Sequence, residues 1–502
     1  MVEKILLLVI FFGIMIAVGF YSRKHATNVN DFVLGGRSVG PWLTAFAFGT
    51  TYFSAVVFVG YAGQFGWKYG VSATWIGLGN AFIGSLLAWV VLGRRTRVMT
   101  NHLKSSTMPD FFGARYHSKA LKIVASAIAF IFLVPYTASV YNGLSRLFGM
   151  AFDIPYWVCV LAMATLTGVY VIMGGYMATA INDFIQGIIM LFGIVAVIIA
   201  VLNGQGGFVD AIKKLGEFKS DIPVSLGQQG AFTSIFGPDP VNLLGVVILT
   251  SLGTWGLPQM VHKFYTIKDE KSIKTGTVVS TIFAIIISGG CYFLGGFGRL
   301  FDNAAIHKVD GSVAYDAIIP HMLSSLPDIL IGIVVVLVLS ASMSTLSSLV
   351  LTSSSTLTLD FLKDNIIKNM SEKKQLKVMR ILIVFFIVIS VVIALDPPTF
   401  IAQLMGISWG ALAGSFLAPF LYGLYWKGVT RAAVWASFAA GVGITVSNMQ
   451  LKYIASPINA GAIAMVSGLI IVPIVSILTP KLSKNKVEEV FSCFDKTVTE
   501  NK

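Results

Sequence analysis

Long apolar segments dominate this chain and limit what it can fold into. A helix that crosses a bilayer needs roughly 18 or more consecutive apolar residues, and about 13 segments of the 502-residue sequence meet that length. Inside a bilayer every backbone polar group must be paired within the protein, which favours helices. We therefore predict an all-α membrane protein with about 13 transmembrane helices, near residues 4–22, 41–65, 71–93, 119–149, 155–174, 179–202, 241–264, 273–299, 328–358, 376–395, 399–425, 430–450 and 457–479.

Composition supports a polytopic membrane protein and argues against an enzyme. Hydrophobic residues make up 56% of the chain and charged residues only 12%. The three cysteines lie far apart without metal-ligand spacing, and no HExxH or Walker motif is present, so no cofactor is expected. The segment Gly406-Ile-Ser-Trp-Gly410 matches G-x-S-x-G, but it lies inside an apolar span, where a nucleophile elbow cannot form.

The formal net charge of +13 reflects membrane orientation. Most of the 36 Lys and Arg residues fall in the segments after spans 1, 3, 7, 9 and 11 and in the C-terminal tail. Cytoplasmic loops carry such an excess, so we predict an N-terminus outside and a C-terminus inside a plasma membrane. A nucleic-acid partner is excluded by this reading, and no obligatory protein partner is evident; membrane lipid surrounds the chain.

Two spans have residues that interrupt a helix in mid-membrane. The second span contains Phe48-Gly-Thr-Thr-Tyr-Phe-Ser54, and the seventh contains Ser251-Leu-Gly-Thr-Trp-Gly-Leu-Pro258. They stand five spans apart, as in transporters built from inverted repeats, where unwound backbone binds ions and substrate. Ordinary kinks are the alternative, because Gly and Pro are common in membrane helices.

This spacing predicts one transporter domain over residues 1–502 with two inverted five-helix repeats, spans 2–6 and 7–11, each beginning with a broken helix. Its parts are the first helix and inner linker (1–40), repeat 1 (41–202), repeat 2 (241–425), two extra helices (426–480) and a cytoplasmic tail (481–502).

The ninth span carries hydroxyl side chains that lipid would not require. On a helix, Ala341, Ser344, Thr345 and Ser348 share one face, with Ser347 beside it. Hydroxyl and carbonyl oxygens on such a face can bind a small hard cation such as sodium. Close helix packing through small residues is the alternative.

Asp183 is an acidic residue inside the sixth apolar span. Intramembrane carboxylates are unfavourable and usually mark an ion path. The predicted topology places Asp183 at a depth similar to that of Ser344, Ser347 and Ser348, which together form a plausible second sodium site. The alternative is a helix-end residue in the interface.

Several motifs together resemble the sodium:solute symporter family over nearly the whole chain. They are Phe32-Val-Leu-Gly-Gly-Arg-Ser-Val-Gly40, Thr107-Met-Pro-Asp-Phe-Phe112, Gly174-Gly-Tyr176 with Asn182-Asp-Phe-Ile-Gln186, and Ser340-Ala-Ser-Met-Ser-Thr-Leu-Ser347. The resemblance implies a first sodium site formed by Thr50, Phe53, Ala341, Ser344 and Thr345. It also implies a second site, present in only some members, formed by Asp183, Ser344, Ser347 and Ser348.

The resemblance also bears on the solute. Proline permeases of this family carry an aspartate where this chain has Tyr52, and aromatic residues where it has Thr250 and Thr254. The segment around Thr51 to Phe58 and Lys68-Tyr-Gly70 is more similar to the branch that handles pantothenate and other carboxylic acids. The residues that the family places around the substrate correspond to Tyr52, Ser54, Gln64, Tyr136, Asn142, Trp255 and Gln403.

We therefore predict a sodium-coupled symporter that imports a small organic solute by alternating access. The solute is expected to be a carboxylate such as pantothenate or a monocarboxylate, or an amino acid such as proline, accompanied by two sodium ions. The alternatives are a proton-coupled symporter in which Asp183 titrates, and a transporter-like channel or sensor.

Overall fold

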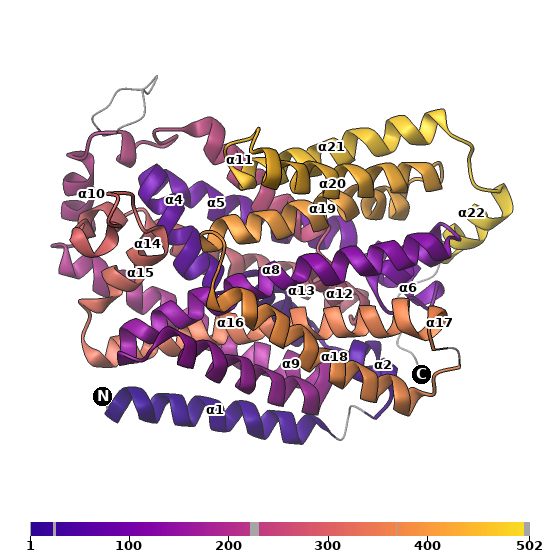
Figure 1. The fold of residues 1–502 in the computed structure, drawn as a ribbon, viewed down its shortest axis with the longest axis horizontal. Coiled ribbons are helices and arrows are strands. Elements are labelled where there is room, and N and C mark those ends of the chain that lie inside the picture. Colours follow the sequence, from indigo (N-terminus) through magenta and orange to yellow (C-terminus); the bar gives the residue numbers. More distant parts are fainter. Residues whose placement is uncertain (1, 24–26, 221–229, 368, 496–502) are drawn as a thin grey trace.

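The computed structural model describes residues 2–23, 27–220, 230–367 and 369–495. Helices make up the described chain, and the long ones lie side by side along the long axis of the molecule (Figure 1). Ten helices in these residues are long and apolar enough to cross a membrane, and the bent pair α11 and α12 makes an eleventh. This arrangement confirms an all-helical, multi-pass membrane protein.

The described residues of the first half of the chain form ten α-helices. They are α1 (Val2–Ser22), α2 (Val29–Leu34), α3 (Pro41–Tyr52), α4 (Ala62–Tyr69), α5 (Thr74–Gly79), α6 (Arg94–His102), α7 (Met108–Arg115), α8 (Lys119–Phe152), α9 (Tyr156–Gly204) and α10 (Phe208–Gly216). Wider π-helical turns at Val56–Tyr61, Asn80–Leu87 and Trp89–Gly93 continue the helices around them.

The described residues of the second half form twelve more α-helices. They are α11 (Pro240–Leu252), α12 (Pro258–Tyr265), α13 (Glu270–Ala284), α14 (Gly290–Gly295), α15 (Tyr315–Ser324), α16 (Asp328–Thr356), α17 (Lys363–Asn365), α18 (Glu372–Leu395), α19 (Ile401–Tyr425), α20 (Arg431–Leu451), α21 (Pro457–Leu478) and α22 (Lys484–Phe491). α16 is central, packs against α9, α8 and α3, and is buried over nearly its whole length.

Both predicted helix breaks are confirmed. α3 ends at Tyr52, and Phe53 has extended backbone (φ −113°, ψ 102°) before the chain turns helical again at Ala55. α11 ends at Leu252, and α12 starts at Pro258 at an angle of 41° to it. Polar residues and proline at these points weaken the helical ladder, which leaves backbone groups free for other partners.

The predicted count of about 13 spans exceeds the ten or eleven that qualify on length and apolarity. The difference lies at two places, α3 with only 12 residues and the first part of α9, where the apolar helix Tyr156–Val169 is short. α9 bends at Gly175, which has φ 56° and ψ −148°. A Cβ there would lie 2.8 Å from the carbonyl oxygen of Phe32, so both the backbone angle and the space require glycine.

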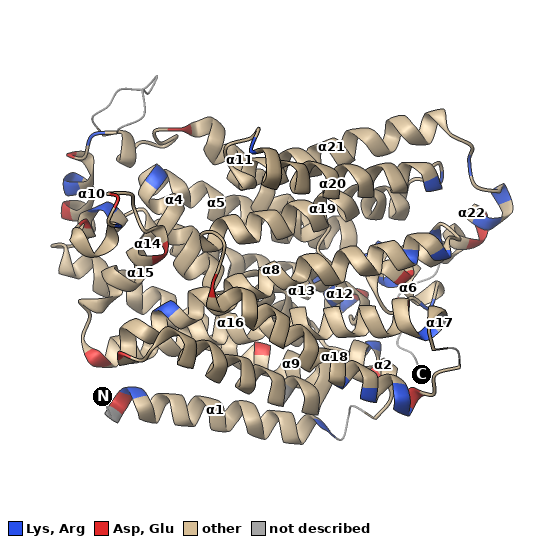
Figure 2. Cartoon of the chain, in the orientation of Figure 1, with Lys and Arg blue, Asp and Glu red and all other residues tan. Residues whose placement is uncertain are grey.

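Charged residues gather toward the two ends of the bundle, and few lie along its middle (Figure 2). Lys and Arg prevail at the end that carries α6, α17 and α22. This is the distribution expected of a protein whose middle is surrounded by lipid.

Candidate functional site

The broken end of α3 meets the hydroxyl face of α16. Ser344 donates a hydrogen bond from its hydroxyl to the Thr50 Oγ1 at 2.7 Å. The Thr345 hydroxyl lies 3.1 Å from the carbonyl oxygen of Thr51 and 3.1 Å from that of Ala341. Four of the five residues predicted for a first sodium site therefore come together, and Phe53 follows directly at the end of α3.

This α3–α16 seam is chemically suited to a small cation. Its oxygens are neutral hydroxyls and carbonyls, and the side chains of Thr50, Ser344 and Thr345 are fully buried. Hard cations take oxygen ligands, and carbonyls released at a broken helix can replace the water around an ion. The five residues stay a prediction for the first ion.

Asp183 lies on α9 and is completely buried. Among the described residues neither oxygen of its carboxylate has a hydrogen-bond partner. Its nearest cation is the ammonium of Lys263 on α12, whose Nζ lies 3.6 Å from Asp183 Oδ2. An unpaired charge at this depth would be strongly unfavourable, so the two groups stabilise one another.

Lys263 also reaches the predicted second sodium site. Its ammonium donates a hydrogen bond to Ser348 Oγ at 2.9 Å, and Ser348 Oγ lies 3.0 Å from Thr51 Oγ1. Ser347 instead donates to the Ser344 carbonyl of its own helix at 2.9 Å. Asp183 and the hydroxyl face of α16 therefore lie close together, and the link between them is a lysine that the sequence analysis did not select.

A signal for Lys263 was present in the sequence. The residue lies inside the predicted seventh span, where a lysine is as rare as an aspartate. Its partners Asp183 and Ser348 are far away in the sequence, so the pattern alone did not connect them.

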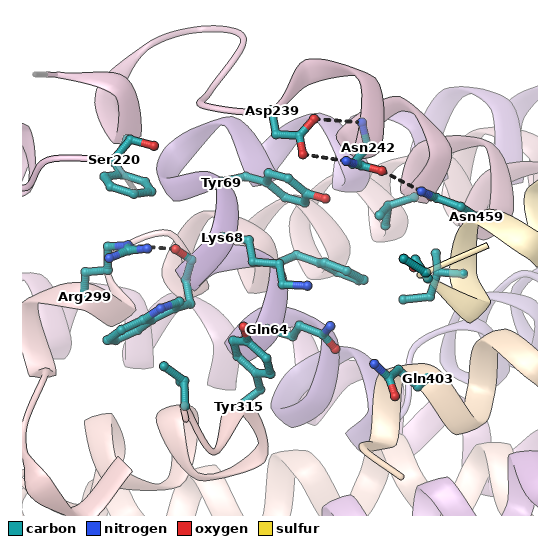
Figure 3. Close-up of a pocket in the computed structure, with 18 of the residues that line it drawn as sticks. Gln64, Lys68, Tyr69, Ser220, Asp239, Asn242, Arg299, Tyr315, Gln403 and Asn459 are labelled. Carbon is teal, nitrogen blue, oxygen red and sulfur yellow. Dashed lines mark hydrogen bonds between the residues drawn. The ribbon is translucent and has the colours of Figure 1, made fainter. Parts of the chain in front are cut away.

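A cavity of about 510 Å³ opens at the end of the bundle opposite α6 and α22. Two residues predicted to surround the substrate, Gln64 on α4 and Gln403 on α19, line it. Figure 3 shows the amine end of Lys68 above the amide of Gln64, and a hydrogen-bonded row of Asp239, Asn242 and Asn459. α4 is fixed here because a Cβ on Gly66 would lie 2.0 Å from the Gly295 backbone, a distance that only glycine allows.

Lys68 and Arg299 are the two cations among the described residues that line this cavity. The Lys68 Nζ lies 5.3 Å from the centre of the Tyr315 ring, and no carboxylate of the described chain is within ion-pair distance of it. Arg299, also in the wall, donates from Nε to the Trp67 carbonyl at 2.8 Å.

The other five substrate candidates lie deeper, away from this cavity. Tyr52 donates to the Thr250 carbonyl at 2.6 Å and stacks on Phe53, with the ring of Trp409 between it and Tyr136. Trp255 donates to the Ile83 carbonyl at 3.0 Å. Asn142 accepts from Arg146, and Ser54 accepts from the Val56 amide.

Comparison with known proteins shows to which family a chain with this architecture belongs. The profile of the Sodium:solute symporter family matches residues 32–441. The chain belongs to the sodium:solute symporter family. Among curated relatives, sodium/proline symporters of Staphylococcus aureus strains JH9 and JH1 are 29% identical over 504 residues, covering 96% of this chain and 93% of theirs.

Solved structures agree on the fold. A sodium-coupled sialic acid symporter in a substrate-bound outward-open state aligns with a TM-score of 0.76 at 18% identity, over 96% of this chain and 99% of the other. A nucleobase-cation-symport-1 family transporter in a closed conformation aligns with a TM-score of 0.52 at 13% identity, over 91% and 97%.

Membership of the sodium:solute symporter family confirms several predictions. The chain is a multi-pass, sodium-coupled solute symporter and not an enzyme, and its coupling ion is sodium, with no further cofactor indicated.

Proposed function

We propose that this symporter imports a small solute that carries a carboxylate, with sodium bound at the α3–α16 seam. The observation that carries the proposal is the direct contact of the broken α3 end with Ser344 and Thr345 of α16. Two elements of different repeats supply oxygens to one buried point, so an ion there would hold both in a single arrangement.

The solute class follows from the cavity. An uncommitted ammonium, Lys68, and two amides, Gln64 and Gln403, can neutralise and hydrogen-bond a carboxylate. A solute bound deeper would meet the buried aromatic group of Tyr52, Tyr136 and Trp409, with Ser54, Asn142 and Trp255 completing the predicted set. Pantothenate, monocarboxylates and proline all satisfy this class, and proline is what the curated relatives are named for.

The proposed topology has 13 crossings. It counts α3 with the π-helical turn and α4 as one span and divides α9 at Gly175 into two. The two inverted repeats then begin at α3 and at α11, the two broken helices. The end that is rich in Lys and Arg is placed inside the cell, so the cavity faces outward and the N-terminus lies outside in the plasma membrane.

The test is uptake of labelled solute into proteoliposomes. A symporter accumulates solute against its gradient only when sodium is imposed outside, whereas a channel merely equilibrates it. Carboxylates and amino acids are first ranked by thermal shift with and without sodium. Uptake that rises at acidic outside pH without sodium would contradict sodium coupling and favour a proton-coupled mechanism.

Variants of the α3–α16 seam test whether sodium binds there. Ser344→Ala and Thr345→Ala are expected to raise the sodium concentration for half-maximal uptake at least tenfold, because each loses an oxygen of the seam. Ser354→Ala is the matched control, since this buried hydroxyl of α16 donates only to the Leu351 carbonyl of its own helix. Unchanged sodium dependence in both site variants would show that the seam only packs the helices.

A further inference from the structure

The ammonium of Lys263 has surroundings that resemble those of a bound metal cation. It lies 3.6 Å from a carboxylate oxygen of Asp183, 2.9 Å from the hydroxyl oxygen of Ser348 and 5.2 Å from the centre of the Tyr176 ring. The lysine is 1% exposed and Asp183 is 0% exposed, so water does not share in this interaction.

These oxygens are the same ones that a second sodium ion would need. Asp183 and Ser348 belong to the predicted second site, and Ser348 also joins Thr51 at the end of α3. A sodium ion bound to Asp183 and Ser348 would have to displace the ammonium from both. The lysine would then be buried without an anion, which is strongly unfavourable.

The balance of charge points the same way. Asp183 contributes one negative charge and Lys263 one positive charge, so the pair is neutral as it stands. A second sodium ion beside it would leave a net positive charge in a region closed to water. The first site differs, because its ligands are neutral oxygens that Lys263 does not contact.

We propose that Lys263 supplies the resident cation of the second site, so that this symporter binds one sodium ion per solute. The inference rests on the proposed function and departs from the expectation of two sodium ions. Lys263 is then a residue that determines coupling stoichiometry: a cation carried by the chain replaces one that would otherwise be taken from solution.

The first test counts sodium ions on the purified full-length protein in nanodiscs, with radioactive sodium at saturation. One ion per protein is expected. Two ions would overturn the inference and leave the proposed function intact, whereas no bound sodium would overturn the proposed function itself.

Variants at Lys263 then test whether this residue determines the number of sodium ions bound per protein. Lys263→Met keeps an unbranched side chain that is one atom shorter and removes its charge, so Asp183 is freed and two ions per protein are expected. Lys263→Arg keeps a cation and should bind one ion. The double variant Lys263→Met with Asp183→Asn removes both charges and should return the count to one. A folded Lys263→Met protein that still binds one ion would contradict the proposal.

Transport by the wild-type protein alone gives an independent measurement of the number of sodium ions per solute. At zero membrane potential, the logarithm of the final solute accumulation should rise with the logarithm of the sodium ratio with a slope of one. A slope of two would refute the inference even if Lys263→Met does not fold.

Discussion

The two ends of this transporter are built differently. At the end proposed to lie inside the cell, here called the inner end, buried hydrogen bonds connect the linker of residues 35–39 to distant helices. At the opposite, outer end, polar side chains surround a cavity of about 510 Å³, and the hydrogen bonds of Asn242, Arg299 and Asn459 there are part-buried or exposed. In the proposed orientation the site would be reached from outside, and a few buried hydrogen bonds would form the barrier at the inner end.

Arg37 is the centre of the inner barrier. Its guanidinium donates to the Tyr265 carbonyl at 3.1 Å, to Thr100 Oγ1 at 3.2 Å and to the Ser105 carbonyl. Next to it, the Val39 amide donates to the Thr266 carbonyl at 3.1 Å. Burial, and secondarily the nearby charge of Arg97, lower the pKa of Arg37 to about 10, yet it stays charged at neutral pH.

The largest effect should come from removing that guanidinium. Arg37→Met leaves buried carbonyls without a donor, each worth about 1–3 kcal/mol, so the barrier should open and sodium-coupled accumulation should fall more than about tenfold. Accessibility is measured in a variant in which the three native cysteines are replaced by serine and Ser105→Cys introduces a single cysteine. This cysteine should react faster with a thiol reagent applied from inside when Arg37→Met is also present.

Two controls qualify this result. Arg37→Lys keeps the charge without the planar fork and should be intermediate, because lysine cannot reach the same acceptors at once. Lys373→Gln alters an exposed cation on α18, in the basic loop region of the same end, and should change nothing. If Arg37→Met left accumulation and labelling at wild-type values, the inner end would be no stronger a barrier than the outer end.

A smaller effect is expected at the outer end from Lys68→Gln. Loss of the ammonium should raise the solute concentration for half-maximal uptake by about tenfold, or about 1.4 kcal/mol, and leave the sodium dependence unchanged. Lys68→Arg, which preserves the charge, should behave nearly as wild type. An equal loss in both variants would indicate that the shape of Lys68, and not its charge, matters to the cavity.

A still smaller change should follow Asn459→Ala. This side chain donates to Asn242 Oδ1 at 2.6 Å across the rim, in an exposed position where water can replace it. We expect loss of this hydrogen bond to cost about 0.5 kcal/mol, which corresponds to less than a threefold change in uptake. Uptake is measured alongside that of Arg37→Met. An effect as large as that of Arg37→Met would remove the distinction between the ends.

The smallest effect concerns pH and the outer loop. Asp302 accepts a hydrogen bond from His307 at 2.7 Å and, with the Gly311 carbonyl, raises the pKa of His307 above its ordinary value. Because the folded pKa is the higher one, this contribution to stability is complete below the unfolded pKa near 6.5. It is lost as pH rises through the folded pKa.

Thermal unfolding at about pH 6 and about pH 8 measures this contribution. Wild type should lose slightly more stability between the two values than His307→Gln, with His102→Gln at the opposite end as the matched control. A larger loss in His307→Gln than in wild type would reverse the sign and contradict the assignment.

The sequence was informative wherever the cause of a structure is local. Glycine, threonine and proline mark the breaks near Phe53 and Gly256, and the spacing of Ser344 and Thr345 places them on one face of α16. The family motif around Arg37 was visible too, but its role in the barrier was not, because its partners lie 63 to 228 positions away.

The remaining details depend on contacts between distant parts of the chain. Lys263 lies within the predicted seventh span, but only the packing of α12 against α9 and α16 reveals its partners. The cavity likewise combines α4, α11, α19 and the start of α21, so Gln64 and Gln403 were found through family resemblance, whereas Lys68 gained its significance from the assembled wall.

The lysine at the second site has an electrical consequence. A carrier that moves one sodium ion with one monoanionic carboxylate transfers no net charge across the membrane, because Lys263 stays attached to the chain, whereas zwitterionic proline would be accompanied by one net positive charge. A membrane potential supplies about 2.3 kcal/mol per charge for each 100 mV, and uptake of a monoanion would draw none of it. Uptake of a monoanion should therefore follow the sodium gradient alone and continue unchanged in a depolarised membrane, whereas a two-sodium carrier of the same solute would slow.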